Sequence, residues 1–219
     1  MSRLLLCLFG VFSWAHATSQ PVPDKIFNGR EYIITGALVS GTPFFNNAEN
    51  SENNTLRFDD VVYQGLPLLY DIKTDQLVTR RPGELTNMII VKEMVDFFTI
   101  GKDTLLHLKE ASTGLADGFY LQVFNSPAYK SVARYKKAVR DPRAINEKRY
   151  YFETVEYFLK TPDSEKFLPV KNIRTLLSVD KQYKKNLKSL LRTHGNREDF
   201  PGSVALVLDY LNKTNRASL

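Results

Sequence analysis

The sequence predicts an α+β protein in which an antiparallel β-meander is followed by a C-terminal cluster of two or three helices. Between residues 28 and 170, short runs of aliphatic and aromatic residues alternate with turns rich in Gly, Pro, Asn and Asp. Short strands separated by such turns favour antiparallel pairing, whereas a parallel sheet would need helical patterns between the strands. Beyond residue 170, apolar residues recur at helical spacing instead.

The antiparallel β domain is expected to cover residues 28–170. Because Pro67 cannot donate a hydrogen bond to a neighbouring strand, the run 66–72 should begin a strand or lie at a sheet edge. A meander of this length can be flat or can curve into a half-barrel, and the sequence leaves both forms open. The expected strands are 32–39, 56–58, 61–63, 66–72, 76–79, 88–91, 95–99, 105–108, 119–124, 129–139, 149–159 and 166–170.

The helical segment is expected to cover residues 171–212 and to pack on the β domain, with a frayed tail at 213–219. Asn172 is a good N-cap for a short first helix at 173–177. The other two helices are expected from Ser178 or Asp180 to about Thr193, and from Pro201 onwards with a buried stripe of Val204, Val207, Leu208 and Leu211.

Residues 1–17 have the three parts of a secretory signal peptide. Arg3 precedes an apolar run at 4–12, and the segment closes on the small-residue motif Ala15-His16-Ala17. The run is too short to act as a permanent membrane anchor. The mature chain should therefore begin with a flexible stretch at 18–27, and no later run is long and apolar enough to span a membrane.

Cleavage would also remove Cys7, the only cysteine, and so exclude disulfides. An exported chain without cysteines is typical of bacteria, so we expect it in a bacterial periplasm or at the cell surface. The remaining histidines, His107 and His194, lack partners at zinc-ligand spacing, and no metal is expected. His107 should be a half-exposed strand residue, and His194 should cap a helix end.

No motif in the sequence indicates catalysis. It lacks a G-x-S-x-G motif, a phosphate-binding loop and a dinucleotide fingerprint. A glycan hydrolase needs two acidic side chains in one cleft. Asp59 and Asp60 are adjacent in an expected turn, while Glu153 and Glu156 should face opposite sides of a strand. We therefore predict no enzyme activity, no catalytic residues and no cofactor.

The formal net charge of +6 is unevenly distributed along the chain. Residues 1–129 carry 10 Lys and Arg against 14 Asp and Glu, whereas residues 130–219 carry 20 against 10. An exported protein with a basic C-terminal part fits an anionic surface, an acidic glycan or an acidic envelope protein as partner, but not a nucleic acid. The candidate contacts share one arc of the second helix: Lys181, Lys184, Lys185, Lys188 and Arg192. A helix face that is simply solvated is the alternative.

Several short segments of the sequence resemble those of a family of exported proteins from bacteroidete-type bacteria. This family has no assigned activity. The segments are Phe27-Asn28-Gly29-Arg30-Glu31-Tyr32, Val61-Val62-Tyr63, the run 66–72, Gly118-Phe119-Tyr120, and the ending from Pro169-Val170-Lys171 to Tyr210-Leu211-Asn212. The resemblance implies a location in the Gram-negative envelope and a β-rich body with C-terminal helices. It implies no catalytic residues.

The leading functional hypothesis is a non-enzymatic exported protein of the cell envelope that binds or scaffolds through its basic C-terminal helix. One alternative is a periplasmic carrier of a lipid or other apolar ligand, which requires a cavity formed by a curved sheet. A second alternative is a glycan hydrolase that uses paired carboxylates.

Overall fold

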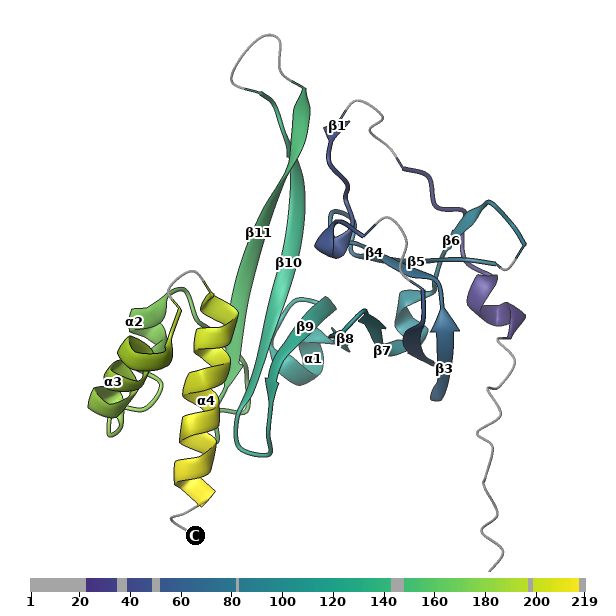
Figure 1. Ribbon diagram of the computed structural model, residues 1–219. Coiled ribbons are helices and arrows are strands. Elements are labelled where there is room, and N and C mark those ends of the chain that lie inside the picture. The colour runs from purple at the N-terminus through teal and green to yellow at the C-terminus, as the bar shows by residue number, and fades with distance from the viewer. Residues whose placement is uncertain are drawn as a thin grey trace, which may run out of the picture.

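A computed structural model describes residues 23–34, 39–48, 52–81, 83–142, 148–196 and 199–216. These residues form a mostly β structure, with a large mixed sheet, a small antiparallel sheet and a few C-terminal helices (Figure 1). This is the α+β composition expected from the sequence. The predicted signal peptide at 1–17 lies outside the described residues, and within them no helix is long and apolar enough to cross a membrane.

The large sheet has nine strands. They are β1 (Val39–Ser40), β2 (Asn54–Phe58), β3 (Val61–Leu66), β7 (Val95–Ile100), β8 (Asp103–Leu108), β9 (Gly118–Asn125), β10 (Lys130–Arg140), β11 (Arg149–Lys160) and β12 (Leu168–Pro169). Their spatial order is β1-β11-β10-β9-β8-β7-β2-β3, with β12 paired to β11. The pairs from β7 to β11 are all antiparallel, and β10 and β11 form a long hairpin that extends beyond the rest of the sheet (Figure 1).

The small sheet consists of β4 (Leu68–Asp71), β5 (Gln76–Arg80) and β6 (Asn87–Ile89), in that order. Asp71 shapes the turn between β4 and β5, because its buried carboxylate accepts hydrogen bonds from the backbone N–H groups of Lys73 and Thr74. The Tyr32 hydroxyl donates to the same carboxylate at 2.8 Å. This turn faces the long hairpin, since the Lys137 N–H on β10 donates to the Ile72 carbonyl at 3.2 Å.

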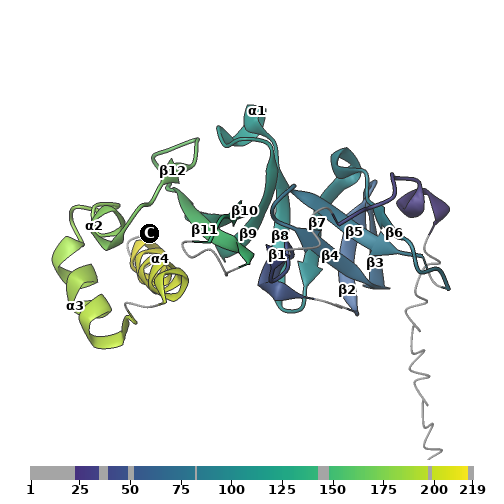
Figure 2. The ribbon, with the colours of Figure 1, turned by 90° about the horizontal axis from the view of Figure 1, so that it is seen from above.

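The helices are α1 (Glu110–Thr113), α2 (Ile173–Leu176), α3 (Lys184–His194) and α4 (Phe200–Arg216). The predicted N-cap is confirmed, since the Asn172 side chain accepts a hydrogen bond from the Thr175 N–H at 3.0 Å. Helix α4 lies between the sheet on one side and α2 and α3 on the other (Figure 2). The predicted buried stripe is also confirmed, since four α4 residues are fully buried: Val204, Val207, Leu208 and Leu211.

The two sheets meet at a cluster of aromatic rings. Tyr70 comes from the small sheet, whereas Phe98 and Phe119 come from the large one, and all three are buried. Their centroids are 5.0 to 5.6 Å apart, with the rings packed edge to face. Such contacts contribute roughly 0.5–1.5 kcal/mol per pair beyond the burial of apolar surface. The aromatic cluster therefore joins the two sheets into one core.

The structure does not confirm a single curved antiparallel meander over 28–170. β1 pairs in parallel with β11, and β4, β5 and β6 form a sheet of their own. The predicted strand at 32–39 is present only as Val39–Ser40, with 35–38 outside the described residues. Parallel pairing between strands so far apart in the chain leaves no local sequence signal, because it depends on tertiary contacts.

Three predicted boundaries also differ from the structure. Ile26 and Phe27, expected in a flexible N-terminal stretch, are buried in the core because their apolar side chains join the main cluster. Helix α3 begins at Lys184, later than expected, after a turn at 181–183. Helix α4 continues to Arg216, past the expected end at 212, and the Lys213–Asp209 ion pair at 2.6 Å supports this last turn.

Gly29 lies where two backbone segments approach each other closely. The Ile89 N–H donates to the Arg30 carbonyl at 2.8 Å, and a Cβ atom at position 29 would lie only 1.6 Å from the Ile89 carbonyl oxygen. Backbone cannot give way as a flexible side chain does. We predict that Gly29→Ala lowers the free energy of unfolding by about 2–3 kcal/mol, the cost typical of an overpacked site.

Urea unfolding followed by circular dichroism measures this loss. The matched control is Asn28→Ala, a change at the exposed neighbour, which should alter stability by less than about 0.5 kcal/mol. A Gly29→Ala variant as stable as the wild type would show that the close approach is not a constraint.

Candidate functional site

The five basic residues predicted to bind an anionic partner lie close together on the surface. Lys181 is in the turn before α3, and Lys184, Lys185, Lys188 and Arg192 are on α3 itself. All five are exposed, and no ion pair within the described part of the chain involves any of them. Helix α3 contains no acidic residue. The structure thus gives this surface a single sign of charge, which we call the basic face.

The opposite side of α3 is used for packing. Leu187 is fully buried in the cluster between α3 and α4. The Tyr183 and Tyr210 rings meet edge to face at 6.3 Å, and the Asn186 amide donates to the Tyr210 hydroxyl at 3.2 Å. Because its apolar side is covered, α3 cannot lie flat in a bilayer as an isolated amphipathic helix does.

A groove of about 580 Å³ borders the basic face. Apolar side chains of Ile173, Leu177 and Leu191 line it. Three cations lie at the same groove: Arg174, Lys188 and Arg192, of which the last two belong to the basic face. We refer to this site as the α2–α3 groove. The combination of an apolar lining with positive charge fits a ligand that has an apolar part and an anionic part.

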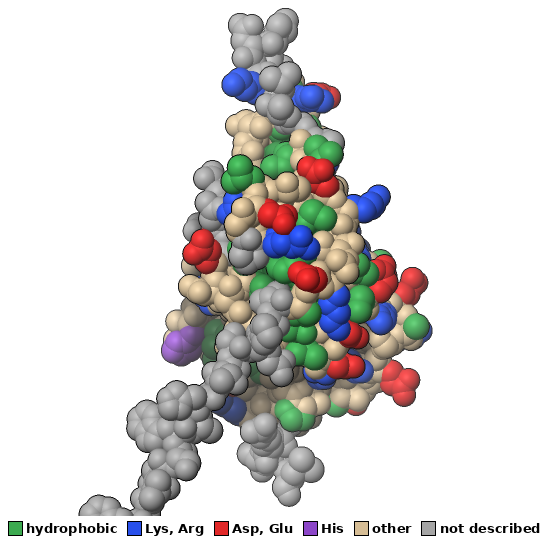
Figure 3. Space-filling model, turned by 90° about the vertical axis from the view of Figure 1, so that its right-hand side faces the viewer, with side chains coloured by type: hydrophobic (Ala, Val, Ile, Leu, Met, Phe, Trp, Pro, Cys, Tyr) green, Lys and Arg blue, Asp and Glu red, His purple; other side chains and the backbone are tan. Residues whose placement is uncertain are grey.

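The side of the molecule away from the helices carries charges of both signs (Figure 3). Figure 3 shows this side, on which hydrophobic, acidic and basic side chains are interspersed. An exposed ion pair also joins Arg81 and Glu84, between β5 and β6, at 3.1 Å. Neighbouring charges of opposite sign cancel each other's field beyond a few ångströms. The surface shown in Figure 3 therefore lacks the single sign of charge found on α3.

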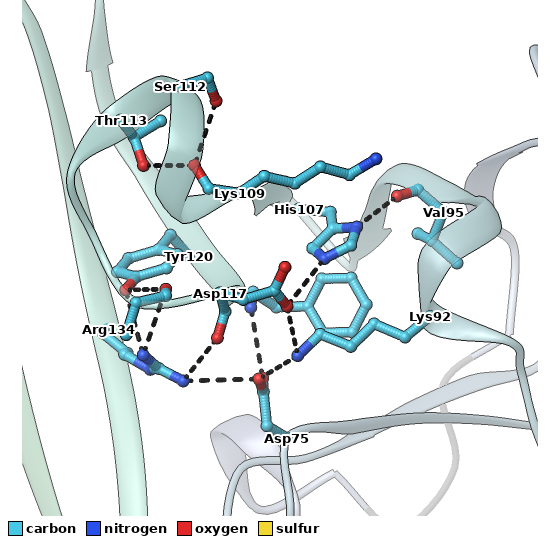
Figure 4. Close-up of polar contacts among 12 residues, drawn as sticks. Asp75, Lys92, Val95, His107, Lys109, Ser112, Thr113, Asp117, Tyr120 and Arg134 are labelled. Atoms are coloured by element: carbon cyan, nitrogen blue, oxygen red, sulfur yellow. Dashed lines mark hydrogen bonds and ion pairs between the residues drawn. The ribbon is translucent and has the colours of Figure 1, made fainter.

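A polar cluster lies beside the aromatic cluster, where the small sheet meets the large one (Figure 4). Asp75, in the β4–β5 turn, is at its centre. One carboxylate oxygen accepts from the Tyr70 hydroxyl at 2.7 Å and from the Phe119 N–H at 3.3 Å. The other accepts from Lys92 at 2.7 Å and lies 3.5 Å from the Arg134 guanidinium. Both carboxylate oxygens are therefore engaged in contacts within the protein.

His107, on β8, belongs to the same cluster. Its side chain is only 3% exposed, so the prediction of a half-exposed strand residue is wrong for the ring. Nδ1 lies 3.0 Å from the Val95 carbonyl oxygen, and Nε2 lies 3.2 Å from an Asp117 carboxylate oxygen. Both partners are acceptors when Asp117 is ionised, so the ring makes both hydrogen bonds only when both nitrogens carry a proton.

The ion pairs of this cluster shift the pKa values of their members. Partial burial acts to lower the pKa of Lys92, but its bonds to Asp75 and Asp117 outweigh burial and raise it. Burial acts to raise the pKa of Asp117, but hydrogen bonds from His107 and Lys92 lower it. Burial raises the pKa of the Tyr70 hydroxyl well above its usual value. The charged forms of Lys92 and Asp117 are therefore favoured, and the Tyr70 hydroxyl is kept neutral.

Arg134 of β10 connects the polar cluster to the long hairpin. Its guanidinium donates to the Tyr120 hydroxyl at 3.1 Å and to the carbonyl oxygens of Ala116 and Asp117 at 3.4 and 3.2 Å. It also lies over the Tyr120 ring, 5.2 Å from the centroid. The cluster thus links the β4–β5 turn of the small sheet to β8, β9 and β10 of the large sheet.

Lys137, on β10, is a buried cation. Its side chain is 4% exposed, and Nζ donates to the carbonyl oxygens of Thr42 and Phe44 and to the Asn47 side chain at 2.7 to 3.0 Å. Burial lowers its pKa, although Glu153 at 3.7 Å opposes this effect. All three ammonium protons are used, so Lys137 anchors the 42–47 loop to the hairpin.

The carboxylate pairs considered for glycan hydrolysis lie in different surroundings. Asp59 and Asp60 both have positive φ values, 52° and 61°, and form the turn between β2 and β3. Glu153 and Glu156 lie on β11 and make ion pairs with Lys137 and Lys136 respectively. The structure therefore does not bring either pair together in one cleft.

Comparisons with known proteins add no further site. No family model matches the chain, and no curated protein or solved structure resembles it significantly. The structure contains two features that the sequence did not indicate, the polar cluster around Asp75 and the buried Lys137. Their members are scattered over residues 70–137 at no regular spacing, so no sequence motif marks them.

Proposed function

We propose that this protein is a non-enzymatic binding protein of the cell envelope whose α2–α3 groove holds an anionic lipid at a membrane surface. The observation that carries the proposal is the apolar groove bordered by Arg174, Lys188 and Arg192. An acyl chain fits the lining of Ile173, Leu177 and Leu191, while the headgroup meets the cations. Export to the envelope, expected from residues 1–17, places the protein where such lipids occur.

The apolar lining favours a lipid over the other anionic partners that the basic helix allows. An acidic glycan or an acidic protein surface would use the exposed cations but would leave the groove unfilled. The buried side of α3 favours contact through the groove and the basic face over insertion of the whole helix. Each basic residue near an anionic membrane surface contributes about 1 kcal/mol to binding at physiological salt.

The test is co-sedimentation with vesicles, using phosphatidylglycerol-rich vesicles as the anionic surface and phosphatidylcholine vesicles as the neutral one. The wild type should bind the anionic vesicles, with affinity falling as salt increases. The double variant Lys188→Glu/Arg192→Glu should bind at least about 30-fold more weakly, since it removes two cations worth about 1 kcal/mol each. Its circular dichroism spectrum should be unchanged, because neither side chain is buried.

Two further variants separate this site from general electrostatics. Lys109→Glu/Lys130→Glu makes the same change of net charge at two exposed residues away from α3, and it should retain most of the binding. Leu177→Ser keeps the charge but removes an apolar group from the groove, and it should weaken binding several-fold. The proposal fails if the wild type binds neither kind of vesicle at low salt, or if the control double variant loses as much affinity as the first.

A further inference from the structure

A second pocket, of about 390 Å³, lies between the β4–β5 turn and the long hairpin. Lys73 and Asp75 line it from the turn. Arg134, Ala138 and Arg140 line it from β10, and they share one face of that strand because they are two or four residues apart. Phe152, which pairs with Ala138 across the hairpin, lines it from β11. The small side chain of Ala138 leaves space in the middle of this face.

The lining of this pocket is strongly basic. It contains five cations and one carboxylate: Lys73, Arg134, Lys136, Lys137 and Arg140, with Asp75. Three of the cations are engaged, Arg134 with Asp75, Lys136 with Glu156 at 2.8 Å, and Lys137 with carbonyl oxygens. Lys73 and Arg140 make no ion pair with any described residue. These two therefore have donors available for a ligand, whereas Arg134, Lys136 and Lys137 each have a carboxylate partner.

Arg140 is held in position by an aromatic ring of the pocket. Its guanidinium carbon lies 3.3 Å from the centroid of the Phe152 ring, so the planar group stacks on the aromatic face. Stacking engages the face of the guanidinium and leaves its N–H edges available for hydrogen bonds. A pre-positioned guanidinium loses little conformational entropy when it binds a ligand, and its forked donors match the oxygens of a phosphoryl group.

We propose that this pocket, the hairpin pocket, binds the phosphoryl group of a small ligand through Arg140 and Lys73. Free phosphate and a phosphate monoester share this chemistry. The volume of about 390 Å³ falls in the range of small-molecule sites and exceeds what one phosphate needs, which favours the ester. The proposal is independent of lipid binding at the α2–α3 groove, because the two sites share no lining residue.

Isothermal titration of the purified protein tests the proposal, with inorganic phosphate, glycerol 3-phosphate and succinate as the probes. The phosphate monoester should bind most tightly, inorganic phosphate more weakly, and the dicarboxylate least. Arg140→Gln should weaken binding of the monoester at least tenfold, and Lys73→Gln several-fold. Ala138→Phe should abolish binding without a change of charge, because the larger side chain fills the pocket.

Lys130→Gln is the matched control, since Lys130 is exposed on the same strand but does not line the pocket, and it should bind like the wild type. Inorganic phosphate binding as tightly as the ester would identify free phosphate as the ligand and leave the site in place. The proposal is overturned if the wild type binds none of the probes, if succinate binds as tightly as the monoester, or if Lys130→Gln weakens binding as much as Arg140→Gln. Thermal unfolding of each variant verifies that it is folded.

Discussion

Replacing Asp75 with Asn is expected to lower the free energy of unfolding by about 3 kcal/mol, because removing one member of a largely buried ion network leaves its partners uncompensated. The Asp75 side chain is 22% exposed and is surrounded by four donors, from Tyr70, Lys92, Phe119 and Arg134. An Asn side chain has the same shape but presents an NH₂ group where one pair of donors needs an acceptor. Asn also tolerates the positive φ of 57° at this position, so backbone strain does not contribute.

Chemical denaturation of the wild type and the variant measures this difference. Asp96→Asn is the matched control, since Asp96 makes an exposed ion pair with Arg57 at 3.0 Å. Exposed pairs contribute only about 0–1 kcal/mol, so the control should be nearly as stable as the wild type. Equal effects of the two substitutions would contradict the role of Asp75 as the centre of the cluster that joins the sheets.

Phe98→Ala is expected to lower the free energy of unfolding by about 4 kcal/mol, within the range seen when a buried aromatic ring is truncated. Phe98 is fully buried, and its ring packs edge to face against Tyr70 at 5.5 Å and Phe119 at 5.0 Å. Since Tyr70 belongs to the small sheet, the loss should weaken both the core of the large sheet and its contact with the small one.

The control for this substitution is Phe98→Leu, which keeps most of the buried apolar volume and should cost about 1–2 kcal/mol. Differential scanning calorimetry also tests whether the two sheets unfold together. A single transition is expected for the wild type. Two separate transitions in the wild type, or a loss below about 1 kcal/mol for Phe98→Ala, would contradict a shared core.

Local patterns in the sequence were enough to predict most of the individual elements. The α4 stripe of Val204, Val207, Leu208 and Leu211 follows helical spacing and is buried as expected. Asn172 caps α2 because its side chain reaches a free backbone N–H within the same turn. These features depend on residues a few positions apart, which is the range over which sequence patterns are informative.

The features that the sequence did not reveal depend on distant contacts. The parallel pairing of β1 with β11 joins Val39 to Arg149, and the separate small sheet arises because β4 pairs with β5 and not with the strands of the large sheet. Lys137 is buried because three acceptors from the 42–47 loop bind its ammonium group. No local rule anticipates an acceptor ninety residues away, as Asn47 is from Lys137.

The candidate site was foreseen in part. The five basic residues from Lys181 to Arg192 were predicted as one surface from helical spacing, and the structure places all five in solvent. The groove beside them was not foreseen, because it needs Ile173 and Leu177 from around α2 to lie beside Leu191 of α3. The hairpin pocket was also missed, since Lys73 lies in the β4–β5 turn of the small sheet and Arg140 lies on β10 of the large sheet.

Hydrogen–deuterium exchange of the wild-type protein, with and without phosphatidylglycerol-rich vesicles, tests the proposed membrane contact most directly. We predict that vesicles slow exchange in the segment from Ile173 to Asn196, which contains α2, α3 and the groove, and that Lys188→Glu/Arg192→Glu removes this protection. Slower exchange confined to the β-sheets, or no change in exchange anywhere at low salt, would contradict the proposed membrane contact.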